Sequence, residues 1–136
     1  MIKEIQDDII GQLQAIPSVK TVDVWQGDIE DLLKVPQKMP SLQLLYQGCS
    51  FESKKVIGAN IAPHDMTFLI VLLNKNLKNR KQGSEECYEI IESLRTKLIS
   101  YKIGGYGWLW PVKEELILAG GGLLAYGLEY KIKTET

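Results

Sequence analysis

The chain has 136 residues, of which 45% are apolar and 24% are charged, and its formal net charge is −1. This length suits one domain with its own core, and the balanced charge gives no general attraction to nucleic acid or to a membrane surface. No apolar run reaches the roughly 18 residues that a membrane-spanning helix needs, and no signal or transit peptide is recognisable. We therefore expect a single domain over residues 1–136 that is located in the cytoplasm.

The N-terminal part of the chain predicts a helix and then a short strand. Apolar residues recur at helical spacing over residues 2–16, and Pro17 ends the pattern. Apolar and polar residues alternate over residues 21–25, which is typical of a strand. The segment 27–40 contains two prolines, so it is a connection outside any sheet centre, and it can hold one helical turn at 28–34.

Two further strands are predicted before the next helix. Residues 42–47 alternate in the manner of a strand, and Gly48 marks a bulge or turn where this strand ends or bends. Residues 66–73 are apolar on both faces, and their short length and β-branched content favour a central strand that is covered on each side. One more strand is possible around Phe51–Ile57.

The last part of the chain predicts a second helix and a hairpin. Apolar residues follow helical spacing over residues 84–101. Strands follow at about 110–118 and 123–133, and the three glycines at 120–122 form the turn between them. This order of elements favours an α+β fold, in which an antiparallel β-sheet of about four to six strands carries two long α-helices packed on one face.

The residue types that carry catalysis are sparse in this sequence. His64 is the only histidine, and neither glycine cluster (104–107 and 120–122) belongs to a phosphate-binding motif. Cys87 lies on the apolar stripe of the second helix, where burial makes a thiol unreactive, and both it and Cys49 are expected to be reduced. We expect no enzymatic activity, no metal and no cofactor.

One local cluster of basic residues stands out in the polar connection 74–83. It consists of Lys75, Lys78, Arg80 and Lys81. It is either a solvated loop or a surface that contacts DNA phosphates or an acidic partner protein. It has no interleaved aromatic residues, so stacking on single-stranded nucleic acid is not indicated.

Large aromatic residues near glycines either belong to a core or anchor a protein interface. Trp110 is interpreted as a core residue, because Pro111 fixes its backbone and the strand continues from it. Trp108 lies in the preceding loop and is the better interface candidate. Trp25 and Tyr106 complete the candidate set for an oligomer or tube interface.

Taken in order, these features resemble the small tail-terminator (tail-completion) proteins of Mu-like bacteriophages and prophages. The resemblance rests on the N-terminal helix up to Pro17, the strand with Trp25, the apolar strand Phe68–Leu73 and the helix Ser84–Tyr101. It also rests on the closing pattern, in which Trp-Pro is followed by Gly-Gly-Leu-Leu-Ala-Tyr-Gly-Leu-Glu-Tyr-Lys-Ile at residues 121–132. It spans almost the whole chain, but the family has no catalytic signature to compare.

The resemblance implies a structural role. Such proteins assemble as rings, commonly hexamers, on the completed tail tube, stop its polymerisation and present a surface for the head-completion protein, while DNA passes through the lumen. The protein would then act in the cytoplasm of the bacterial host and become part of the virion tail. The resemblance assigns no role to single residues. The strand at 123–133, or a hairpin around 51–57, is a candidate edge for pairing with a neighbouring subunit.

Two other classes of function remain open at this point. The first is a small nucleic-acid-binding α+β module that uses the basic loop 75–81. The second is a small hydrolase or ligand-binding protein, which would require His64 and a carboxylate or Cys87 to converge in a pocket.

Overall fold

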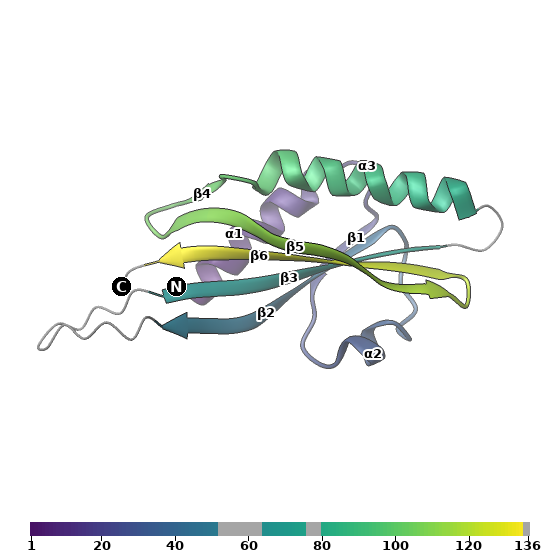
Figure 1. The fold of residues 1–136 in the computed structure, drawn as a ribbon, viewed down its shortest axis with the longest axis horizontal. Coiled ribbons are helices and arrows are strands. Elements are labelled where there is room, and N and C mark those ends of the chain that lie inside the picture. Colours follow the sequence, from purple (N-terminus) through teal and green to yellow (C-terminus); the bar gives the residue numbers. More distant parts are fainter. Residues whose placement is uncertain (52–63, 76–79, 135–136) are drawn as a thin grey trace, which may run out of the picture.

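The computed structural model describes residues 1–51, 64–75 and 80–134 (Figure 1). In chain order, its elements are α1 (Ile2–Gln14), β1 (Thr21–Val24), α2 (Ile29–Leu32), β2 (Ser41–Phe51), β3 (His64–Lys75), α3 (Arg80–Leu98), β4 (Lys102–Ile103), β5 (Gly107–Gly120) and β6 (Leu123–Thr134).

The strands form one six-stranded sheet in the order β1-β2-β3-β6-β5-β4. β1 runs parallel to β2, whereas all other neighbours are antiparallel. β6 lies between β3 and β5, so both of its edges are paired. The candidate edge at 123–133 is therefore unavailable to a neighbouring subunit, because hydrogen bonds within the chain already occupy it.

The expected fold class is wrong. The sheet is mixed rather than antiparallel, and Figure 1 shows that it twists and curls. Only α3 is long, with 19 residues, whereas α1 has 13 and α2 has 4. The parallel pair arises because the connection between β1 and β2 crosses over the sheet and returns the chain in the same direction. Alternation along a strand shows which side chains are buried, but it does not show the direction of the neighbouring strand.

Two separate apolar clusters lie on the two faces of the sheet. The larger cluster combines the apolar stripes of α1 and α3 with alternate residues of β2, β3 and β6. The smaller one is formed by α2 and its flanking residues against the other face of β3, where Leu69, Val71 and Leu73 lie. Figure 1 shows α2 on the side of the sheet away from α3. The prediction of a central strand covered on both faces is thus confirmed for β3.

Several boundaries differ from the sequence prediction. β5 begins at Gly107, so Trp108 lies in a strand rather than in a loop. α3 begins at Arg80, four residues before the predicted start, so the basic connection is shorter than expected. The predicted bulge at Gly48 is confirmed, since the pairing of β2 with β3 shifts between Tyr46 and Gly48. The possible strand at 51–57 falls outside the described residues beyond Phe51, which ends β2.

Candidate functional site

The outer edge of β5 is the main unpaired edge of the sheet. β4 covers only its first residues, through the pairs Lys102–Trp108 and Ile103–Gly107. Backbone hydrogen bonds then join Leu109 to Ser100 and Tyr101. Beyond Leu109, no strand of the described residues pairs with this edge. An open edge of this length presents backbone donors and acceptors to a further strand.

Exposed apolar side chains gather on the same strand. Five residues of β5 rank among the exposed large apolar residues of the described chain: Trp108 (57%), Trp110 (52%), Val112 (47%), Leu116 (52%) and Leu118 (36%). Isolated exposed apolar residues are ordinary, but five of them on one edge strand are typical of an interaction surface. The edge of β5 is therefore the candidate functional site.

The same edge carries features that restrict which strand can pair with it. Pro111 removes one backbone donor, and the pairing with β6 is irregular at two places, between Pro111 and Lys113 and between Leu116 and Leu118. Lys113, Glu114 and Glu115 put three charges in the middle of the strand. Proteins use such devices to prevent indiscriminate edge-to-edge aggregation. This edge consequently favours a partner that matches its charges.

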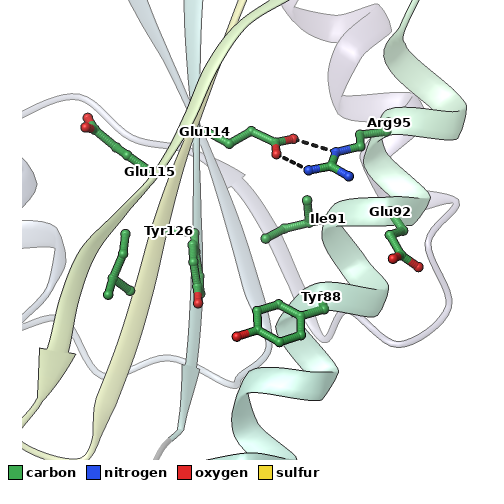
Figure 2. A pocket seen from close by; sticks show the side chains of 8 residues that line it. Tyr88, Ile91, Glu92, Arg95, Glu114, Glu115 and Tyr126 are labelled. Atoms are coloured by element: carbon green, nitrogen blue, oxygen red, sulfur yellow. Dashed lines mark hydrogen bonds and ion pairs between the residues drawn. The ribbon is translucent and has the colours of Figure 1, made fainter.

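A groove of about 310 Å³ lies between β5 and α3. Its wall on α3 includes Tyr88 and Ile91, while Leu116 and Tyr126 line it from the sheet (Figure 2). The rings of Tyr88 and Tyr126 meet edge to face, with their centres 6.5 Å apart. The groove thus combines apolar with charged side chains, since Glu92, Arg95, Glu114 and Glu115 also line it.

An ion pair bridges the groove between helix and strand. Arg95 of α3 donates through Nε to Glu114 Oε2 of β5 at 3.0 Å, and a second hydrogen bond joins its Nη2 to Oε1 (Figure 2). This two-point contact raises the pKa of Arg95, because both the hydrogen bonds and the negative charge of Glu114 favour its cationic form. The positive charge of Arg95 therefore balances the negative charge of Glu114.

Tyr130 of β6 lies close to this ion pair. Its side chain is buried, and its hydroxyl has no hydrogen-bond partner among the described residues. Burial, together with the nearby charge of Glu114, raises the pKa of Tyr130 to about 12. The hydroxyl is accordingly neutral at physiological pH.

The structure separates the three aromatic residues predicted for an interface. Trp25 packs against the smaller core cluster, and its Nε1 donates to the carbonyl oxygen of Asp28 at 3.0 Å. Tyr106 is half-buried against the larger cluster. Trp108 is exposed, and Lys102 Nζ lies 5.8 Å from the centre of its ring. The interface role of all three stays a prediction, but only Trp108 presents most of its surface to solvent.

The interpretation of Trp110 as a core residue is wrong, since it is one of the exposed residues of β5. Trp110 lies opposite Lys131 of β6, on the face of the sheet away from α1 and α3. A signal for this position exists in the sequence: Pro111 lies inside a strand, and proline in a strand is confined to edges and bulges. Neighbouring elements cover the side chains of an edge strand less than those of a central strand.

The predicted basic loop is divided among different elements. Lys75 ends β3 and is exposed, whereas Lys78 lies outside the described residues. Arg80 and Lys81 belong to the first turn of α3, and Lys81 Nζ lies 3.9 Å from Glu85 Oε1. A contact between this segment and DNA or a partner protein stays a prediction.

Among the residues that the structure describes, no three His, Cys, Asp or Glu side chains gather in a way that could hold a metal ion. Cys49 and Cys87 are free thiols, and burial raises the pKa of Cys87 to about 11, so its thiol is protonated and inert at neutral pH. His64 is the first residue of β3. No helix in the described ranges is long and apolar enough to cross a membrane.

No protein-family model and no curated protein matches this chain. A solved structure does: a chain from the virion of a native gene transfer agent particle superposes with a TM-score of 0.56 at 11% sequence identity. The similarity covers 94% of this chain and 92% of that one. At this level of identity it shows a common fold.

Proposed function

We propose that this chain is a structural protein of a phage-like particle. The observation that carries the proposal is the end-to-end similarity of fold with a chain of a gene transfer agent virion, which is a phage-like particle. The similarity spans nearly all of both chains, so the whole fold is shared rather than one motif within it. An apolar strand edge on the surface agrees with a protein that works by contact with other subunits.

Within this class, we propose the role of a tail terminator. The protein assembles as a homo-oligomeric ring, a hexamer, on the end of the tail tube and stops its polymerisation. The ring then offers a surface to the head-completion protein, and DNA passes through its lumen without sequence-specific contacts. The resemblance of the sequence to Mu-like tail terminators supports this role, and subunits joined head to tail form a closed ring when their rotation closes. The protein acts without catalysis.

Deletion of the gene in the phage or prophage that encodes the chain tests this role directly. Without a terminator, tube polymerisation has no stop signal, so electron micrographs of induced lysates are expected to show headless tails of widely varying length. Expression of the wild-type chain from a plasmid is expected to restore tails of uniform length joined to heads. Headless tails of normal, uniform length would contradict the terminator role, although they would still agree with a structural role elsewhere in the particle.

A further inference from the structure

Trp108 and Trp110 of β5, together with the neighbouring Lys102 and Lys131, form what we call the tryptophan patch. We propose that copies of the chain associate when the tryptophan patch of one copy enters a hollow beside α2 of another. The partner is thus a second copy of the chain. This inference goes beyond the proposed function, because it concerns the isolated protein and does not require a tail tube.

The tryptophan patch presents apolar and basic groups on one face of the sheet. Only the buried Leu109 separates Trp108 from Trp110, so both rings lie on the face away from α1 and α3. Lys102 of β4 pairs with Trp108, and its Nζ lies 5.8 Å from the centre of the ring. Lys131 of β6 lies opposite Trp110. A complementary surface must therefore offer an apolar hollow with acidic groups beside it.

A hollow with these properties lies between α2 and the sheet, and its volume is about 530 Å³. Ile29, Leu45 and Leu69 supply its apolar lining. Asp28 and Glu30 also line it, and both residues are exposed. None of the described residues that line the hollow is basic. Cavities of this volume take up small molecules, so the hollow has room for an indole ring.

The tryptophan patch of one copy cannot fill the hollow of the same copy. Leu45 and Leu69 belong to β2 and β3, whereas both tryptophans belong to β5, and β6 lies between β3 and β5. Neighbouring strands lie about 4.8 Å apart, so three spacings hold β2 and β5 about 14 Å apart within the sheet. Only a second copy brings a patch and a hollow together.

Charge distinguishes this hollow from other depressions on the described surface. The groove between α3 and β5 contains three glutamates, but it also contains Arg95, which is paired with one of them. The depression beside the turn at 120–122 has Lys34 and Lys75 against Glu30 alone. In both places, the lysines of an incoming patch would meet a like charge, and such contacts disfavour binding. The hollow beside α2 presents acidic groups alone.

This contact joins two different surfaces of the chain. After one contact has formed, the first copy still has a free hollow and the second copy still has a free tryptophan patch. Contacts of this kind form a closed ring when their rotation closes and an open chain otherwise. The same contact therefore suits the ring of the proposed function, and it buries both tryptophans in the assembly.

Sedimentation velocity over a range of protein concentrations tests the proposal. The wild-type chain is expected to associate as its concentration rises. The double variant Trp108→Ala/Trp110→Ala removes both anchors of the contact and is expected to associate about thirtyfold more weakly. Circular dichroism melting checks that this variant and those that follow are folded.

Charge reversal on either side of the contact tests its electrostatic part. Lys102→Glu/Lys131→Glu makes the tryptophan patch acidic, and Asp28→Lys/Glu30→Lys makes the hollow basic. Each variant puts like charges together and is expected to associate about tenfold more weakly than the wild-type chain.

The matched control for the hollow is Glu89→Lys/Glu92→Lys, which makes the same change of charge at two exposed positions of α3. Glu92 lines the groove between α3 and β5, so this control also tests that groove as an alternative. It is expected to leave association unchanged.

Mixing the two charge-reversed variants separates the contact from any effect on folding. An acidic patch of one variant then meets a basic hollow of the other, while the remaining patch and hollow keep their original charges. Both combinations are attractive. The equimolar mixture is therefore expected to associate about as strongly as the wild-type chain, and so is the quadruple variant that combines all four substitutions.

A wild-type chain that stays monomeric at every concentration would overturn the proposal. An assembly that the double tryptophan variant leaves unchanged would also overturn it, as would a control on α3 that weakens association as much as Asp28→Lys/Glu30→Lys. A mixture of the two charge variants that associates no better than either alone would exclude contact between the patch and the hollow. The terminator role is decided separately, by the tail lengths of the gene-deletion strain.

Discussion

Two tyrosine hydroxyls of this protein lie in contrasting surroundings. Tyr101 donates a hydrogen bond to Asp8 Oδ1 at 2.7 Å and accepts one from Gln12 Nε2 at 3.3 Å, so it joins the segment after α3 to α1. The hydroxyl of Tyr130 is buried without a partner in the described part of the chain. A buried polar group that makes no hydrogen bond reduces stability, whereas a satisfied one contributes to it.

Tyr130→Phe is therefore expected to raise the free energy of unfolding by about 1 kcal/mol, because it removes an unsatisfied hydroxyl and keeps the ring. Tyr101→Phe is the matched control and is expected to lower it by about 1 kcal/mol. Urea denaturation at neutral pH measures both. A loss of stability in Tyr130→Phe as large as that in Tyr101→Phe would show that the Tyr130 hydroxyl has a stabilising partner.

At the scale of single residues, the sequence predicted some environments and missed others. The apolar stripe correctly placed Cys87 in the core. Trp110 was misplaced because Pro111 was interpreted as support for a core position, although proline inside a strand indicates an edge or a bulge. The groove between α3 and β5 was missed because Arg95 and Glu114 are distant in sequence and meet only in the folded chain.

Among the elements, the β5–β6 hairpin shows how one turn fixes a pairing. Its turn residues Gly121 and Gly122 have φ values of 60° and 77°, a region that side chains with a Cβ atom rarely adopt. A Cβ atom added at Gly121 would meet no atom within 4 Å, and the same holds at Gly120, whose φ is not in this region. The two positions differ only in backbone conformation.

Gly121→Ala is expected to cost about 1–2 kcal/mol of stability, since alanine must adopt the left-handed conformation without any steric contact elsewhere. Gly120→Ala is the control and is expected to change stability by less than about 0.5 kcal/mol. Thermal melting compares the two variants with the wild-type chain. Equal effects at both positions would show that the backbone of the turn adapts without cost.

The sequence predicted most of the helices and strands, but it did not predict how the strands pair or in which direction they run. Helical spacing found α1 and α3, and alternation found β1 and β2. An unbroken apolar run found β3, and the three glycines at 120–122 marked the turn of the closing hairpin. The parallel direction of β1 and the position of β6 between β3 and β5 depend on contacts between segments that are far apart in sequence. The strand β4 has only two residues, which is too short to show a repeating pattern of apolar and polar residues.

For the molecule as a whole, exposure separates the two tryptophans that are free to contact a partner, Trp108 and Trp110, from Trp25, which packs against the core. Trp108→Ala and Trp110→Ala are expected to cost no more than about 1 kcal/mol of stability, because both side chains are largely exposed. Trp25→Ala is expected to cost about 2–3 kcal/mol, since it removes a ring packed in the smaller core cluster.

If Trp108 and Trp110 contact partner subunits, their variants are expected to fold normally and yet fail to restore uniform tails in the gene-deletion strain. Chemical denaturation and electron microscopy measure the two properties separately. Full restoration by a stable Trp108→Ala/Trp110→Ala double variant would exclude these side chains from the interface.

The position of β6 has a consequence for synthesis of the protein on the ribosome. β3, the most apolar strand, has its second partner in β6, which the ribosome makes only after α3, β4 and β5. Until β6 emerges, the nascent chain exposes one edge of an apolar strand, and such edges promote aggregation. Chaperone demand during translation should therefore be greatest in the interval between the emergence of β3 and that of β6.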